Sequence, residues 1–246
     1  PSYDRYSRFC EELLPTSCSV YNFVSAYFMK QVDRHRPYSG ALHCEAPELE
    51  IASIHKIHNP RLWDKYQAEV VDIWGLCEGK TKPIMDNLID AKSIGMTIKG
   101  NLMNEFFLFH GVPTDLSERI ATQGFDDRYA GEHFGTLFGR GTYFAETASK
   151  SDIYTSPDND GHRVIFFSRV CLGETHSTKV SMDVWKPPER SDRRGPMNSI
   201  RAERLINGGC VEYLEYVIYR SSQAYPEYKI KYKHRDSCAC THCSRK

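Results

Sequence analysis

The spacing of apolar residues changes along the chain, from helical in the first third to strand-like after residue 105. Between Arg61 and Trp74, apolar side chains recur at three- and four-residue intervals, directly after the capping residue and first-turn proline of Asn59-Pro60. An earlier short helix is expected to end before Pro15, and a second apolar stretch runs from Val20 to Val32. The pattern therefore places most helices early in the chain.

Short apolar runs that are typical of strands make up the remainder. They lie at residues 51–57, 106–110, 142–145, 163–172, 211–220 and 225–232. The run at 163–172 is continuously apolar, as in a strand that is buried on both faces. Ser221-Ser222-Gln223 joins the last two strands, which predicts a hairpin or two neighbouring strands. Early helices followed by many strands predict an α+β fold rather than alternating βαβ units.

Two polar residues stand where these strands would otherwise be apolar. His110 ends one run and is followed by Gly111, which lets a ligand approach the backbone because it has no Cβ. Glu215 lies in a run that is apolar on both faces, where a carboxylate is costly to bury unless it is paired or used in chemistry. A strand-end histidine that reaches solvent and a salt-bridged structural glutamate are the simpler alternatives.

A third candidate region is centred on Tyr143, which follows Gly139 and Gly141. Thr147 is expected to cap a helix after this strand. Ser151 and Tyr154 are three residues apart on that helix and so share a face. A hydroxyl and a second aromatic ring are thus expected on the side of Tyr143, although an aromatic residue in a strand is ordinarily part of the core.

Together these regions resemble one family. The segments FLFHG, GRGTYFAETASKSDIY and EYLEYVIYRSSQAYPEY, in that order, are similar to the His–Tyr–Glu signature of the poly(ADP-ribose) polymerase catalytic domain, a diphtheria-toxin-like ADP-ribosyltransferase. The resemblance implies two packed, antiparallel-rich sheets flanked by a few helices, with a central NAD cleft. It divides the chain into an N-terminal helical extension and linker (1–47), the catalytic domain (48–234) and a Cys-rich basic tail (235–246).

The resemblance also implies how NAD is held at its nicotinamide end. Gly111 would bind the carboxamide through its backbone, and Ser151 would add a hydroxyl. Tyr154 would stack on the nicotinamide ring, with Tyr143 on the other side. Glu215 would bind the hydroxyl of the nicotinamide ribose and act with His110 and Tyr143 as the catalytic set.

At the adenosine end, His110 would hydrogen-bond the 2′-hydroxyl of the adenine ribose. The loop at 124–128, including Arg128, would cover the adenosine and pyrophosphate. The family usually has Ser or Thr after the His-Gly pair, whereas this chain has Val112. The missing hydroxyl is expected to weaken NAD binding.

The implied activity is NAD-dependent transfer of ADP-ribose to protein acceptors, including automodification, with NAD⁺ as substrate and no metal required. The middle of the chain resembles the macrodomain-bearing members and favours single transfer. The segment EYVIYRSSQAYPEY resembles the tankyrases, and retention of Glu215 keeps polymer formation open. An inactive NAD or ADP-ribose binding module and a transferase acting on nucleic-acid ends are the alternatives.

The tail contains Cys238, Cys240, Cys243 and His242, which are weak candidates for a metal site, with His234 as another fourth ligand. The C-x-C-x-x-C spacing is a poor match to paired zinc knuckles, so a disordered or oxidation-prone tail is the favoured interpretation.

Composition limits the partners and the cellular compartment that are expected for the chain. The chain has 246 residues, with 32 basic and 32 acidic residues, so a coating role on nucleic acid is not favoured. The chain contains no run of 18 apolar residues, so no membrane-spanning helix is predicted. Six of the nine cysteines are scattered singly, which favours reduced thiols and an intracellular protein, nuclear or cytoplasmic.

Overall fold

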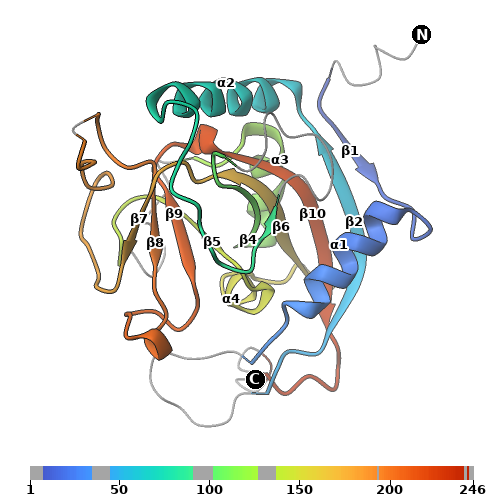
Figure 1. Ribbon diagram of the computed structural model, residues 1–246. Helices are drawn as coiled ribbons and strands as arrows, with labels where there is room; N and C mark the ends of the chain where they lie inside the picture. Colours follow the sequence, from blue (N-terminus) through green and yellow to red (C-terminus); the bar gives the residue numbers. More distant parts are fainter. Residues whose placement is uncertain are drawn as a thin grey trace.

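A computed structural model describes residues 8–34, 45–90, 102–126, 137–192, 194–240 and 243 (Figure 1). The α-helices are α1 (Ser19–Lys30), α2 (Pro60–Leu76), α3 (Ser117–Gln123) and α4 (Ala148–Asp152). The strands are β1 (Cys10–Leu13), β2 (Leu49–His58), β3 (Ile89–Asp90), β4 (Glu105–Val112), β5 (Thr142–Ala145), β6 (His162–Cys171), β7 (Thr175–Thr178), β8 (Ser199–Ala202), β9 (Glu215–Ile218) and β10 (Ala224–His234).

The described strands form one path of hydrogen-bonded neighbours, β1-β2-β10-β6-β4-β5-β9-β8-β7, with β3 paired to β4 beside it. The β7–β8 pair is parallel, and the other strand pairs are antiparallel. The α+β class is thus confirmed. The two expected sheets are two halves of one path, joined where β4 meets β5 at a single register pair, Phe109 with Ala145.

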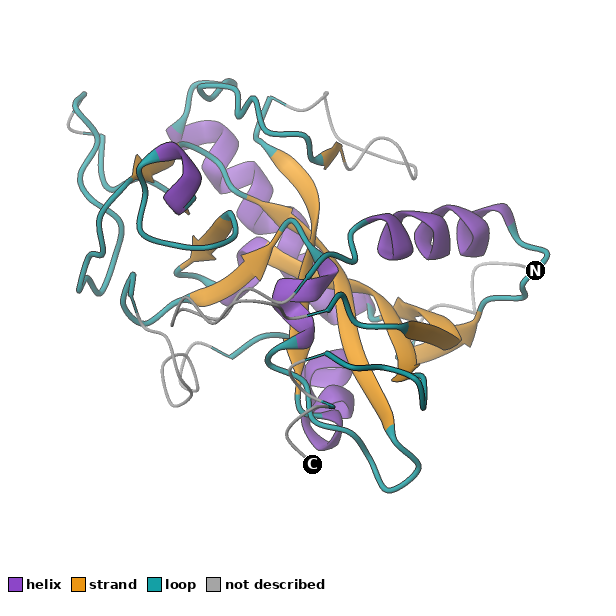
Figure 2. Ribbon diagram, turned by 90° about the horizontal axis from the view of Figure 1, so that it is seen from below, coloured by secondary structure: helices purple, strands orange, loops and turns teal. Residues whose placement is uncertain are grey.

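Helices cover both sides of this sheet, as Figure 2 shows. Helix α1 packs Val24 and Phe28 into a core of strand aromatics that includes Phe109 and Phe167, and its Tyr27 ring stacks on Phe109 at 5.9 Å between centroids. Aromatic pairs of this kind add to the stabilisation from burial alone. No described helix has the length and apolar character to cross a membrane.

Helix α2 runs along the top of the view in Figure 1 and begins as the sequence predicts. The Asn59 side chain accepts a hydrogen bond from the Leu62 N–H at 3.2 Å, and Pro60 occupies the first helical position. Tyr66 and Ile73 of this helix are fully buried. They fix its apolar face against the strands, as the three- and four-residue spacing predicts.

Two predicted elements are wrong. Cys10–Leu13 is not a helix but an edge strand paired antiparallel with β2. Strands β9 and β10 are neither a hairpin nor neighbours, because β9 pairs with β5 and β8 while β10 pairs with β2 and β6. The five residues 219–223 between them therefore carry the chain from one half of the sheet to the other.

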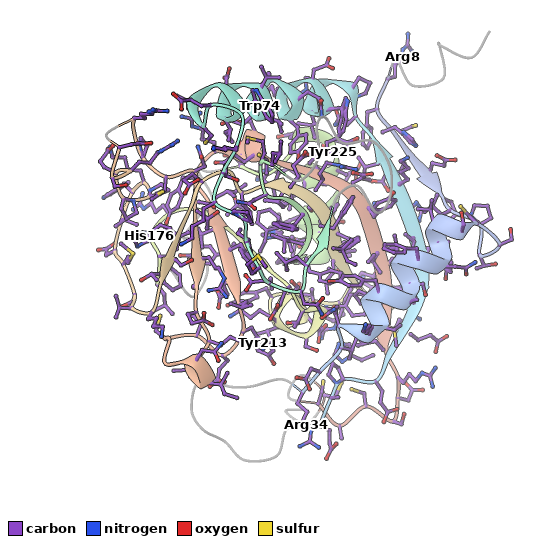
Figure 3. All side chains as sticks on the ribbon, in the orientation of Figure 1. Arg8, Arg34, Trp74, His176, Tyr213 and Tyr225 are labelled. Atoms are coloured by element: carbon purple, nitrogen blue, oxygen red, sulfur yellow. The ribbon has the colours of Figure 1, made fainter. Side chains whose placement is uncertain are left out.

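The segment that follows α1 lies against the region of the predicted site. The Ala148 N–H donates to the Gln31 carbonyl at 3.0 Å, and the Asp33 N–H donates to Ser149 Oγ at 2.6 Å. The Tyr213 hydroxyl donates to the carbonyl of Arg34, and Figure 3 labels both residues at the lower part of the molecule. These bonds fix the start of α4 and the loop before β9.

Candidate active site

The candidate site lies where the two halves of the sheet join. Ala145 of β5 pairs with Phe109 of β4 on one side and with Glu215 of β9 on the other. Adjacent strands are about 4.8 Å apart, so these three positions form one short row across the sheet. His110 and Gly111 directly follow Phe109, and α4 begins three residues after Ala145. The topology thus gathers segments that are far apart in sequence.

His110 is half-buried and bridges β4 and β5. Its Nδ1 lies 2.7 Å from the carbonyl oxygen of Tyr143, and its ring contacts those of Phe125 and Phe144. A carbonyl only accepts hydrogen bonds, so Nδ1 carries the proton and Nε2 of the neutral ring keeps its acceptor lone pair. Such an acceptor is suited to a ligand hydroxyl.

Burial lowers the pKa of His110, and the bond to the Tyr143 carbonyl opposes this only in part. The imidazole is therefore neutral at pH 7. Because the unfolded-state pKa is near 6.5 and the folded-state pKa is lower, the unfolded chain binds the proton first on acidification. The stability that the buried neutral imidazole contributes is full above pH 6.5 and declines as pH falls below it.

We expect the affinity for NAD to be flat above pH 6.5 and to fall on acidification, when Nε2 takes up a proton and can no longer accept a hydrogen bond. Calorimetric titrations at a series of pH values measure this. The His110→Gln variant cannot titrate in this range and should lose the acid dependence. An unchanged acid dependence in that variant would contradict the assignment.

The orientation of the Tyr143 ring is fixed by hydrogen bonds between its hydroxyl and the preceding turn. That hydroxyl accepts from the Phe138 N–H at 3.0 Å and donates to the Gly139 carbonyl at 2.9 Å. Gly139 has φ +76°, and a Cβ there would lie 1.6 Å from the Val184 carbonyl oxygen. The turn therefore requires glycine, and its bonds to the hydroxyl fix the orientation of Tyr143.

Gly111 lies directly against α4. A Cβ at this position would be 1.8 Å from the carbonyl oxygen of Ser151, so only glycine permits this approach. The described β4–β5 ladder ends at Phe109, so β5 does not cover Gly111. Ser151 is buried, whereas Tyr154 lies just past the end of α4 and is 36% exposed. Gly111 and Ser151 are therefore in contact, whereas Tyr154 is not on the helix that was expected to carry it together with Ser151.

Glu215 is buried and paired with a lysine that the sequence reasoning missed. Lys150 Nζ lies 2.9 Å from Glu215 Oε1, and both side chains are only 6% exposed. The same ammonium donates to the Tyr154 hydroxyl at 3.0 Å and lies 5.0 Å from the centre of that ring. One lysine thus connects the carboxylate to the exposed aromatic ring, and it holds the carboxylate at a fixed point.

The sequence contains one indication of this lysine. Thr147 caps α4 by accepting from the Lys150 N–H at 3.4 Å, as predicted, and this cap fixes which residues of the short helix face inward. A lysine directly before Ser151 is then a candidate for an inward charge. Its partner lies on another strand, so only the tertiary structure identifies the pair.

Arg128 and Val112 are the remaining residues that the sequence singled out for NAD binding. Arg128 lies outside the described residues, whereas Phe125 of the same loop contacts His110. Val112 is buried in an apolar cluster with Ile57 and Phe166, so it contributes to the core at this position. The ring of His110 packs on Phe125 and Phe144 but is only half-buried, so a strand-end histidine that partly reaches solvent is also compatible with the structure.

The fold and the site together define an α+β domain with a neutral histidine, two tyrosines and a buried lysine–glutamate pair gathered at the junction of a divided antiparallel sheet. The sequence profile described as "Poly(ADP-ribose) polymerase catalytic domain" matches residues 33–234. The chain therefore belongs to the poly(ADP-ribose) polymerase catalytic domain family. The match begins upstream of the boundary expected at residue 48.

Curated relatives of the chain carry consistent names. It is 29% identical over 232 residues to protein mono-ADP-ribosyltransferase PARP14 of Homo sapiens, covering 93% of this chain and 10% of that protein. It is 30% identical over 190 residues to protein mono-ADP-ribosyltransferase PARP12 of Mus musculus, covering 76% of this chain and 22% of that protein. The chain thus spans a quarter or less of the length of these relatives.

Proposed function

We propose that this chain is an NAD-dependent ADP-ribosyltransferase that transfers single ADP-ribose units to protein acceptors. The observation that carries the proposal is the Lys150–Glu215 pair beside Tyr154, at the junction with His110 and Gly111. Family membership supports the substrate, NAD⁺. The names of the relatives support single transfer, since PARP14, PARP12 and PARP10 are each named as mono-ADP-ribosyltransferases.

The proposed reaction breaks the bond between nicotinamide and C1′ of its ribose. Nicotinamide leaves with the bonding electron pair, and positive charge develops on the ribose. A fixed carboxylate at Glu215 stabilises that charge more in the transition state than in the ground state. The ion pair with Lys150 holds the carboxylate of Glu215 in place. A nucleophilic side chain of the acceptor then bonds to C1′ and releases its proton to solvent.

Binding would use the remaining residues. Gly111 and Ser151 would hold the carboxamide, and the rings of Tyr143 and Tyr154 would enclose the nicotinamide. Neutral His110 would accept a hydrogen bond from the adenine-ribose hydroxyl through Nε2, which its bond to the Tyr143 carbonyl leaves free of a proton. Positioning of this kind brings the scissile bond to a fixed place. None of these steps uses a metal ion.

The setting of the reaction is also part of the proposal. None of the described cysteines is in a disulfide, which supports a reducing, intracellular environment. Protein side chains, including those of the chain itself, are the proposed acceptors. The balance of charge over the whole sequence gives little support to nucleic acid as an acceptor.

Incubation with NAD labelled in its adenylate part tests the proposal. We expect discrete labelled protein bands on a denaturing gel. His110→Ala should raise KM for NAD, while His176→Ala, on the distant strand β7, should leave labelling unchanged. A high-molecular-weight smear would contradict single transfer. Labelling of added single-stranded oligonucleotides, but not of protein, would contradict the acceptor. NAD binding without transfer would indicate a binding module.

A further inference from the structure

Three cysteines and a histidine meet beyond the end of β10. His234 is the last residue of that strand, and the chain then turns so that Cys238, Cys240 and Cys243 face it; we call these four residues the tail cluster. One ligand atom from each member lies within 4.8 Å of every other. Cys240 is fully buried and Cys238 nearly so. The tail as far as Cys240 is therefore packed on the domain, not disordered as the sequence suggested.

The spacing of the ligand atoms matches a tetrahedral zinc site. The three sulfur atoms lie 3.6, 3.3 and 3.5 Å from His234 Nδ1. With Zn–S near 2.3 Å and Zn–N near 2.0 Å, the S···N edge of a tetrahedron is about 3.5 Å. Thiol hydrogen bonds do not explain the convergence, because an imidazole nitrogen has one lone pair and cannot accept from three thiols.

We propose that the tail cluster binds one structural zinc ion. Three thiolates and one imidazole are a preferred set for this metal, and four protein ligands leave no open position for catalysis. The fourth ligand is His234, contributed by the strand, whereas His242 lies outside the described residues. The C-x-C-x-x-C spacing alone does not predict the site, because the fourth ligand, His234, lies four residues upstream of Cys238.

Neighbouring groups are arranged as they are around bound metals. His234 Nε2 lies 3.0 Å from Oδ1 of Asp152, which is fully buried, and the Tyr232 hydroxyl donates to the same oxygen. Metal-binding histidines commonly donate a hydrogen bond from their second ring N–H to a carboxylate, which orients the ring and raises its basicity. In addition, the Glu48 N–H donates to Cys238 Sγ at 3.3 Å, a contact that favours the thiolate.

The carboxylate partner links the tail cluster to the rest of the domain. Asp152 is the last residue of α4, the helix that carries Lys150 and Ser151. A metal-bound His234 would thus hold the C-terminal end of α4, while the segment after α1 holds its start through Ser149. We expect removal of the metal to lower the midpoint of thermal unfolding, and zinc to restore it.

The zinc content of the chain, purified under reducing conditions and measured by elemental mass spectrometry, tests the proposal. We expect about one zinc per chain, consistent with a single closed site. Cys240→Ser should lose it, and Cys10→Ser, a half-buried cysteine on β1, should retain it. A wild-type chain that stays free of zinc after incubation with Zn²⁺ and reductant would overturn the proposal, as would zinc retained by Cys240→Ser.

Two further measurements test the ligand set and the role of Asp152, and the first of them needs no variant. Exchange of the metal for Co²⁺ in the wild type should give the absorption of tetrahedral cobalt with thiolate charge transfer, and its absence would contradict the ligand set. Asp152→Asn should weaken zinc about 10- to 100-fold in competition with a chelating dye. Asp72→Asn, on the exposed side of α2, is the matched control. Equal zinc affinity in both variants would contradict the role of Asp152.

Discussion

Glu215→Gln is expected to slow ADP-ribose transfer by about 100- to 1,000-fold, the range typical of removing one preorganised electrostatic contact from a transition state. The amide keeps the shape of the side chain but not its negative charge. Binding of NAD in the ground state should change little, because the carboxylate acts mainly on charge that develops during bond cleavage. Single-turnover rates and calorimetry on the same preparation separate the two effects.

The same substitution should also destabilise the fold, because it removes the negative charge that faces the buried ammonium of Lys150. Breaking a buried ion pair in this way costs about 3–5 kcal/mol. The double variant Lys150→Met/Glu215→Gln removes both charges and should recover much of that free energy, as measured by urea unfolding. It should not recover transfer. Recovery of transfer in the double variant would contradict the proposed role of Glu215.

Glu227→Gln provides the matched control. Glu227 on β10 is also buried and ion-paired, with its Oε2 2.7 Å from Arg169 Nε. Its loss should lower stability to a similar degree and leave the rate of the transfer step unchanged in the folded fraction. Equal loss of transfer in the two glutamine variants would mean that Glu215 acts only through the stability of the fold.

The second large effect is expected at Gly111. The Cβ of Gly111→Ala would lie 1.8 Å from the Ser151 carbonyl oxygen, so α4 or β4 must move. Overpacking of this kind costs about 1–3 kcal/mol of stability. Displacement of α4 by about 1 Å would also shift Lys150 and Ser151, and misplacement on that scale can cost about 100-fold in rate.

Gly75→Ala separates this effect from a general intolerance of glycine substitution. A Cβ at Gly75, in α2, would meet no atom within 4 Å. Replacing a helical glycine with alanine should stabilise the chain by about 0.5–1 kcal/mol and leave transfer unchanged. Thermal unfolding and transfer rates of the two variants test this contrast. A Gly111→Ala chain with wild-type stability and rate would contradict the close packing of β4 on α4.

The sequence predicts the elements of the site well where local signals agree with tertiary packing. The strand predicted at 142–145 has the same bounds in the structure, and the caps at Asn59 and Thr147 make the expected hydrogen bonds. Each of these depends on residues within one turn of the chain. Strand alternation is also a local rule: it puts His110 on the face of Phe106 and Leu108, whose cluster includes the Phe125 and Phe144 rings that His110 contacts.

The errors come from long-range pairing. Local propensity favours a helix at Cys10–Leu13, but antiparallel pairing with β2 makes it an edge strand. Side-chain contacts of Glu11 with Lys229 on β10 and of Glu12 with His58 on β2 add to this pairing. The Lys150–Glu215 pair and the position of His234 among the tail cysteines depend in the same way on contacts between distant segments. Motif spacing cannot show contacts of this kind.

The central claim is that this chain cleaves NAD at the nicotinamide bond with Glu215 as the stabilising charge. Nicotinamide release, measured alongside calorimetric NAD binding, tests it most directly. We predict that the wild type binds NAD and releases nicotinamide, and that Glu215→Gln binds NAD with similar affinity but releases nicotinamide at least about 100-fold more slowly. Equal release by the two proteins, or binding without release by the wild type, would contradict the claim.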